Sequence, residues 1–220
     1  MEEEDWFDIT KIMLLEYREF LNLKKGILKR FYRIKDPQSR IFVINSLRFL
    51  SQHNPHLGGI RYSIYSENWT GKITIRSSIL GDVTNSGVPR YKELTNQHFE
   101  VINKGVYHQE YLYLQMKTLQ SQWEISEVVK TEVYKKNLKI IEPSRIVEEI
   151  KNIHAEFDLI LQPYEKIAVT KILSLHHSKD WGISENLYDA LKLLHSNPCF
   201  KTLLRHHILA WKVIGLLIMI

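Results

Sequence analysis

The sequence predicts an α+β protein with N-terminal helices, a central antiparallel β-sheet of about four or five strands, and a C-terminal helical bundle. Three observations predict it. Apolar residues recur at the spacing of one helix face in residues 1–50, the hydrophobic period changes to two at Ile60, and helical spacing returns after Pro143. We expect residues 1–141 to form a helical segment plus the sheet, and residues 142–220 to form a helical subdomain packed closely on the first.

The N-terminal part of the chain is predicted to form two helices. The recurring apolar residues of the first helix are Met13, Tyr17, Phe20 and Leu21. The second helix is predicted to begin near Ser39 and to end by Pro55, because proline and the glycines that follow it interrupt helices. Its recurring apolar residues are Ile41, Ile44 and Leu47.

Alternation of apolar and polar residues predicts the strands of the sheet. Ile60–Tyr65 and Ile73–Arg76 flank a turn at Ser66–Gly71 and are predicted to form a hairpin. Two longer alternating runs follow, Val106–Leu119 and Trp123–Tyr134. Their connection is short enough for antiparallel pairing, so we expect them to be neighbours in the same sheet.

The chain after Pro143 is predicted to be helical throughout. The recurring apolar residues of its first helix are Ile146, Ile150, Ile153, Phe157 and Ile160. A second helix is predicted through Ile167–Leu175. The third has Ser184 as its N-cap, and the last begins at Asn197-Pro198, since a polar cap followed by proline suits a helix N-terminus.

The charge of the chain indicates an anionic partner. The formal net charge is +5, and Met1–Asp8 alone contributes −5, which leaves +10 on the rest of the chain. A field of that sign steers a protein toward phosphate-bearing partners or anionic membrane surfaces.

Basic and aromatic residues are concentrated between Lys24 and Arg40. The candidate binding residues are Lys24, Lys25, Lys29, Arg30, Phe31, Tyr32, Arg33, Lys35 and Arg40. Single-stranded nucleic acid is held by neutralisation of phosphates together with base stacking on aromatic rings. The run therefore predicts a non-enzymatic protein that binds RNA or a nucleoprotein, such as a viral matrix or accessory component. An anionic membrane surface or a solvated helix face explains the same charges.

Two other functions fit the sequence. The apolar stretch Ile208–Ile220 and a face formed by Tyr107, Tyr111 and Tyr113 suit a protein-interaction or assembly subunit that binds a protein partner or itself. Both features are also typical of side chains buried in a core, which is the commoner role of such residues. An enzyme of the nuclease type remains an alternative, if carboxylates and histidines converge only in three dimensions.

The motifs of several common chemistries are missing from the sequence. It contains neither GxSxG nor HExxH, and the glycines of Gly81–Gly87 are not followed by the Gly-Lys-Ser/Thr of a phosphate loop. The ten histidines and Cys199 lack the short paired spacing of a structural zinc site. We therefore expect no catalytic residues, no metal and no cofactor.

The sequence also predicts a compartment. Cys199 is the single cysteine, which favours a reducing environment. The acidic N-terminus does not resemble a secretory signal, and Ile208–Ile220 is shorter than the about 20 apolar residues that span a bilayer. We expect a cytoplasmic or nuclear protein that is not secreted and has no transmembrane helix.

Overall fold

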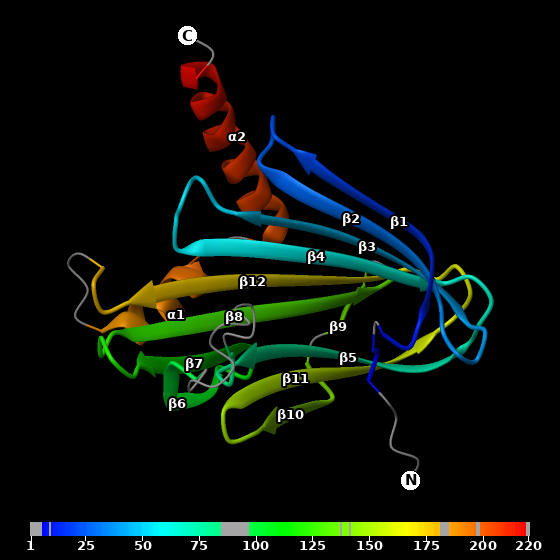
Figure 1. Cartoon of the computed structure of the whole chain (residues 1–220), viewed down its shortest axis with the longest axis horizontal. Coiled ribbons are helices and arrows are strands. Elements are labelled where there is room, and N and C mark those ends of the chain that lie inside the picture. Colours follow the sequence, from blue (N-terminus) through cyan, green and yellow to red (C-terminus); the bar gives the residue numbers. More distant parts are fainter. Residues whose placement is uncertain are drawn as a thin grey trace, which may run out of the picture.

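A computed structural model describes residues 6–8, 10–84, 97–136, 138–140, 142–180, 185–196 and 199–218. These residues form two packed β-sheets and two C-terminal helices (Figure 1). The strands are β1 (Met13–Asn22), β2 (Ile27–Lys35), β3 (Ile41–Leu50), β4 (Leu57–Ser66), β5 (Gly71–Leu80), β6 (Phe99–Tyr107), β7 (Tyr111–Thr118), β8 (Glu124–Lys135), β9 (Leu138–Ile140), β10 (Arg145–Glu148), β11 (Asn152–Leu161) and β12 (Ile167–His177). The helices are α1 (Asn186–Ser196) and α2 (Phe200–Ile218).

The large sheet has the strand order β1-β2-β3-β4-β12-β8-β7-β6, and β9 pairs with β8 at its end. All of these neighbours are antiparallel. The small sheet has the order β10-β11-β5 and lies against one face of the large sheet (Figure 1). The core between the two sheets consists of apolar side chains such as Ile79, Leu114, Val129, Phe157 and Ile167.

The two helices cover part of the opposite face of the large sheet (Figure 1). A second apolar core lies beneath them. It includes Val128 and Ile172 from the sheet, and Leu194, Phe200 and Leu203 from the helices. Strands β8 and β12 are therefore covered on both faces. In β12 this explains why the apolar residues do not alternate cleanly with polar ones.

The predicted α+β fold is wrong, because the N-terminal helices are strands. The residues expected on one helix face, from Met13 to Leu21, belong to β1, which is the edge strand of the large sheet. Apolar side chains on both faces of β1 are exposed, so their spacing matches a helix by coincidence. In β3 the buried residues Val43, Ser46 and Phe49 recur at a spacing of three because both faces of that strand are partly covered.

The predicted hairpin between Ile60–Tyr65 and Ile73–Arg76 is also wrong. These segments lie in β4 and β5, which belong to different sheets: β4 pairs with β3 and β12, whereas β5 pairs with β11. The connection between them crosses from one layer of the sandwich to the other. Alternation identified the two strands but carried no information about their partners.

The C-terminal helical bundle is wrong as well. The helix predicted from Ile146 to Ile160 is the hairpin β10–β11, and Ile150 lies 91% exposed in its turn. The helix predicted at Ile167–Leu175 is β12. The helical subdomain predicted for residues 142–220 thus contains three strands that pair with strands before residue 141, or with one another, and two helices that lie on the sheet.

Several predicted features lie outside the described residues: most of Met1–Asp8, the end of Gly81–Gly87, Ser184 and Asn197-Pro198. None of the helices in the described part of the chain combines the length and the apolar character needed to cross a bilayer.

Candidate functional site

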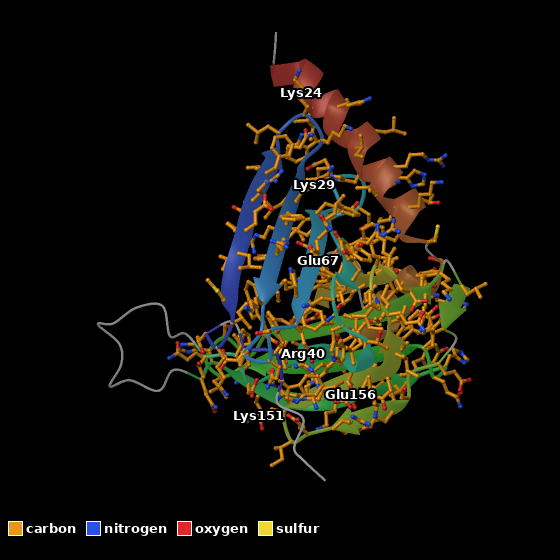
Figure 2. All side chains as sticks on the ribbon, turned by 90° about the vertical axis from the view of Figure 1, so that its right-hand side faces the viewer. Lys24, Lys29, Arg40, Glu67, Lys151 and Glu156 are labelled. Atoms are coloured by element: carbon orange, nitrogen blue, oxygen red, sulfur yellow. The ribbon has the colours of Figure 1, made fainter. Side chains whose placement is uncertain are left out.

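The basic run predicted as a binding site does not form one surface. Lys24 and Lys25 lie in the turn between β1 and β2, and Arg40 directly precedes β3 (Figure 2). Successive side chains of a strand point to opposite faces, so β2 divides the others. One face carries Lys29, Phe31, Arg33 and Lys35, and the other carries Arg30 and Tyr32.

The three arginines of this run already have carboxylate partners. Arg33 binds Glu67 through two parallel hydrogen bonds of 2.8 and 2.7 Å, and these bonds hold the pKa of the Glu67 carboxyl below its usual range. Arg30 pairs with Glu19 on β1. Arg40 pairs with Asp36. Much of the positive charge that suggested RNA is thus neutralised within the fold.

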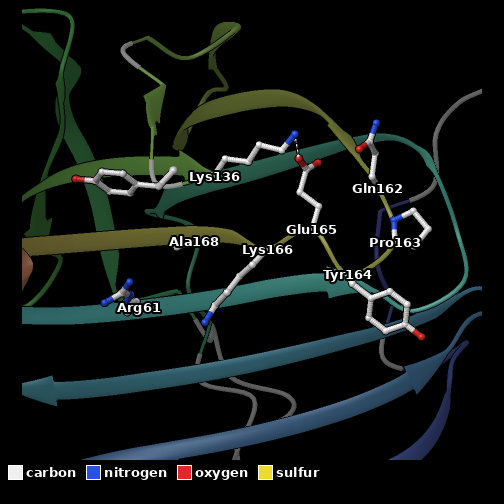
Figure 3. Close-up of a pocket in the computed structure, with 9 residues that line it drawn as sticks. Arg61, Lys136, Gln162, Pro163, Tyr164, Glu165, Lys166 and Ala168 are labelled. Atoms are coloured by element: carbon white, nitrogen blue, oxygen red, sulfur yellow. Dashed lines mark ion pairs between the residues drawn. The ribbon is translucent and has the colours of Figure 1, made fainter.

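A cavity of about 500 Å³ lies near one end of strands β4, β8 and β12 (Figure 3). Its lining residues are Arg61, Tyr134, Lys136, Gln162, Pro163, Tyr164, Glu165, Lys166 and Ala168. Ala168 pairs with Tyr134 on one side and with Ser63, two residues from Arg61, on the other. Opposed residues share a face of a sheet, so the three strands present these side chains together. The turn from β11 to β12 supplies the remaining wall.

Three cations and one carboxylate line the cavity. Lys136 lies 3.2 Å from Glu165, and Lys135, just outside the lining, lies 3.1 Å from the other oxygen of the same carboxylate. Burial acts to raise the pKa of Glu165, but the two lysines outweigh it and hold that pKa below its usual value. By contrast, neither Arg61 nor Lys166 has an ion pair with any carboxylate of the described residues.

Two tyrosines add aromatic surface to the cavity. The hydroxyl of Tyr134 donates a hydrogen bond of 2.8 Å to Glu132, and burial together with this bond raises the pKa of Tyr134. Tyr164 is 74% exposed and has a φ of 60°, in the left-handed region. Its backbone N–H donates a hydrogen bond of 2.7 Å to the carbonyl of Ser66, which fixes the turn. The cavity combines rings with charges that suit an anion.

Glu165 is the single carboxylate in the cavity lining, and two lysines engage it. The carboxylate of this lining is therefore already engaged by cations of the same domain.

The described residues contain no group of three potential metal ligands. The histidines considered in the sequence have other partners: His176 stacks on His56 with ring centroids 4.0 Å apart, and His195 lies 3.3 Å from the hydroxyl of Tyr111. Cys199 is exposed, and hydrogen bonds from Thr202 hold the pKa of its thiol below the usual value.

The predicted tyrosine surface is largely a packing surface. Tyr111 is 3% exposed and belongs to the core beneath the helices, and Tyr113 packs against that core. Tyr107 lies on β6 and is partly exposed. The sequence did not point to Arg61, Lys166 or Tyr164, because no local motif links them.

The fold is shared with a solved structure of a longer protein chain. A solved structure described as "Putative kojibiose phosphorylase from human microbiome" superposes with a TM-score of 0.78 and 15% identity, covering 96% of this chain and 26% of that chain. The chain is thus a β-sandwich domain of a kind found within a larger protein. Residues 1–214 match "Glycosyl hydrolase family 65, N-terminal domain", and the chain belongs to that family.

Proteins related to this chain in sequence have names like those of the family and of the solved structure. An uncharacterized glycosyl hydrolase of Mycobacterium tuberculosis is 25% identical over 206 residues, which are 94% of this chain and 15% of that protein. The kojibiose phosphorylase of Halothermothrix orenii is 33% identical over 115 residues, 52% of this chain and 14% of that protein. The α,α-trehalose phosphorylase of Thermoanaerobacter brockii is 33% identical over 79 residues, 36% and 10% of the two chains. The chain thus spans at most 15% of the length of these relatives.

Family membership corrects the predicted function. A viral protein that binds RNA or a nucleoprotein through Lys24–Arg40 is wrong, and so are the partners inferred from charge and exposed apolar residues, namely nucleic acid, an anionic membrane surface, and a protein partner or second copy. Composition reported the net charge correctly but could not show that internal ion pairs engage the arginines.

Proposed function

We propose that this chain is the N-terminal domain of a carbohydrate-active enzyme that cleaves a disaccharide, and that it supports a catalytic region rather than carrying the catalytic carboxylates itself. The match of residues 1–214 to the family carries this proposal. The names of the relatives, kojibiose phosphorylase and trehalose phosphorylase, supply the substrate class.

The first hairpin offers a surface for such a region. Strand β1 is an edge strand, and it exposes several large apolar side chains together with the turn that follows it. The side chains that are more than half exposed are Met13, Leu14, Phe20, Leu21 and Leu23. An edge strand with exposed apolar side chains marks an interaction surface or an aggregation hazard. In relatives several times longer than this chain, the rest of the polypeptide is the natural occupant.

Complementation tests the proposal. The kojibiose phosphorylase of Halothermothrix orenii, lacking the segment that matches this chain, is mixed with the purified chain, and phosphate-dependent cleavage of kojibiose is measured. We expect the chain to restore activity and Phe20→Ser with Leu21→Ser to reduce the restoration. Leu138→Ser, at an exposed position on β9, is the matched control. If the chain fails to restore activity, it does not support a catalytic region. If the chain alone cleaves kojibiose, it carries catalytic residues itself, and the proposal is wrong on that point.

A further inference from the structure

His207, on α2, joins two other parts of the chain at one end of the large sheet (Figure 1). Its Nδ1 atom accepts a hydrogen bond of 3.1 Å from the backbone N–H of Gln52, in the loop between β3 and β4. Its Nε2 atom lies 3.0 Å from the carbonyl of Gly26, in the turn between β1 and β2. A carbonyl oxygen can only accept, so Nε2 carries the hydrogen. Neutral imidazole is therefore the form that makes both bonds, which we call the His207 bridge.

The surroundings of His207 disfavour a second proton on its ring. The residue is 0% exposed, and the ring stacks on Phe49 with centroids 4.9 Å apart. No carboxylate of the described residues forms an ion pair with His207. Within four residues of Gly26, Gln52 and His207 along the chain, every other ionisable side chain is basic. These side chains are Lys24, Lys25, Lys29, Arg30, Arg48, His53, His56, Arg205 and His206.

Protonation is incompatible with the His207 bridge. A hydrogen on Nδ1 points at the N–H of Gln52, so two donors face each other in a buried place and a hydrogen bond is lost. If α2 separates from the loop and the turn, the ring enters water, where an imidazole has its ordinary pKa of about 6.5. Uptake of the proton is therefore coupled to opening of the bridge, and acid favours the open form.

We propose that the His207 bridge is a pH-sensitive switch, which holds α2 on the β1–β2 turn and the β3–β4 loop near neutral pH and releases it in acid. Phe200 and Leu203, at the start of α2, belong to the apolar core beneath the helices. Further along the helix, Trp211 donates its indole hydrogen bond to the carbonyl of Leu23 in the same turn. Opening therefore frees the later part of α2 and the turn, and leaves the start of the helix in place. This switch goes beyond the proposed function and does not depend on it.

Amide hydrogen exchange of the purified chain tests the switch, with rates corrected for the intrinsic effect of pH. Linkage to one imidazole predicts that the open fraction rises about tenfold between about pH 7.5 and pH 5.5. Protection should fall by that factor in the β1–β2 turn, the β3–β4 loop and the later part of α2. These segments should also exchange faster than β8 at the lower pH. No change with pH would overturn the proposal, and so would exchange of α2 at the rate of β8, because α2 would then be released only by unfolding of the whole domain.

His207→Gln separates the proton from the hydrogen bonds. Glutamine offers an acceptor and a donor on a side chain that does not titrate, so protection of the three segments should change by less than about twofold between the two pH values. His206→Gln is the matched control one residue earlier on α2, and it should keep the tenfold change. A tenfold change that persists in His207→Gln, or disappears in His206→Gln, would overturn the assignment to His207.

Histidine side-chain NMR of the unmodified protein tests the same bridge without a substitution. At about pH 7.5 the ring of His207 should be neutral and should carry its hydrogen on Nε2, because Nδ1 faces the N–H of Gln52. A hydrogen on Nδ1 at this pH, in either the neutral or the charged ring, would overturn the proposal.

Discussion

Gly26 and Trp211 are in direct contact, although they lie at opposite ends of the chain. A Cβ atom added to Gly26 would lie 2.5 Å from Cδ2 of the Trp211 ring. The indole N–H of Trp211 donates a hydrogen bond of 2.6 Å to the carbonyl of Leu23, and His207 lies 3.0 Å from the carbonyl of Gly26. The turn between β1 and β2 is therefore fastened to α2.

Gly26→Ala should destabilise the domain by about 3 kcal/mol, because alanine is disfavoured at a φ of 61° and its methyl group would clash with Trp211. Urea denaturation measures the loss. In a Trp211→Ala background the clash is absent, so Gly26→Ala should then cost only about 1–2 kcal/mol for the left-handed backbone. An equal cost in both backgrounds would show that the ring does not exclude the methyl group.

Glu156, which is labelled in Figure 2, is 1% exposed on β11. Two arginines hold its carboxylate. Arg76 donates a hydrogen bond of 2.6 Å to one carboxylate oxygen, and Arg145 donates to the other. Glu156→Gln leaves two arginines facing a neutral group, so we expect a loss of about 3 kcal/mol in the free energy of unfolding. Asp158→Asn, at a more exposed position on the same face, should cost less than about 1 kcal/mol. Similar losses for both variants would argue against a special role for the buried carboxylate.

Glu127 and Lys171 are partly buried charges on neighbouring strands of the large sheet. Burial raises the pKa of Glu127 and lowers the pKa of Lys171, and in each case the partner's charge opposes the shift. Lys171 also donates a hydrogen bond of 2.5 Å to the carbonyl of Ser78 in the small sheet.

Lys171→Met should destabilise the domain, because it leaves the carboxylate without its counter-charge and the Ser78 carbonyl without its donor. Combining it with Glu127→Leu should recover about 1–3 kcal/mol relative to the sum of the single variants. A double-mutant cycle in urea measures this coupling. Additive effects would mean that the two charges do not interact.

His176 is 4% exposed and stacks on His56 with an interplanar angle of 6°. Burial, and then the positive charge that His56 can carry, lower the pKa of His176; His177 acts in the same direction, whereas Asp180 and Asp189 act against it. Below the unfolded value of about 6.5 the unfolded chain therefore takes up this proton more readily than the folded protein. The corresponding stability is present above pH 6.5 and is lost as the pH falls through the lower folded pKa.

His176→Gln should reduce the fall in unfolding free energy between about pH 6.5 and pH 5, measured by urea denaturation at several pH values. His98→Gln makes the same change at an exposed position and should leave the pH dependence unaltered. A pH profile of His176→Gln that parallels the unmodified protein would exclude His176 as the source.

The spacing of apolar residues along the chain correctly predicted some helices and strands of this fold. It failed for other elements for a physical reason. The run Trp123–Tyr134 coincides closely with β8, and the helix predicted to follow Ser184 coincides with α1. Where both faces of a strand are alike, alternation disappears. Strand β1 is apolar and exposed on both faces, and β11 is buried on both, so each gave a helical spacing that the fold does not use.

The cavity could not be predicted in the same way. Arg61 and Lys166 are far apart in the sequence and become neighbours only because β12 pairs with β4. That pairing depends on which strands share a sheet. The spacing of apolar residues along the chain does not encode this. The basic run Lys24–Arg40 was visible in the sequence, but the carboxylates that engage its arginines come from β1, from the turn before β3 and from the residue after β4.

The position of β12 also determines when the domain can form. It joins two halves of the large sheet, with β4 on one side and β8 on the other. Strand β4 ends at Ser66, yet β12, its partner on the inner side, begins only at Ile167. A ribosome therefore releases both halves with open inner edges, and neither is completed until β12 emerges. Pairing across such sequence distances slows folding and prolongs the exposure of strand edges. Cutting the chain between β8 and β12 would thus leave two unfinished sheets rather than one smaller domain.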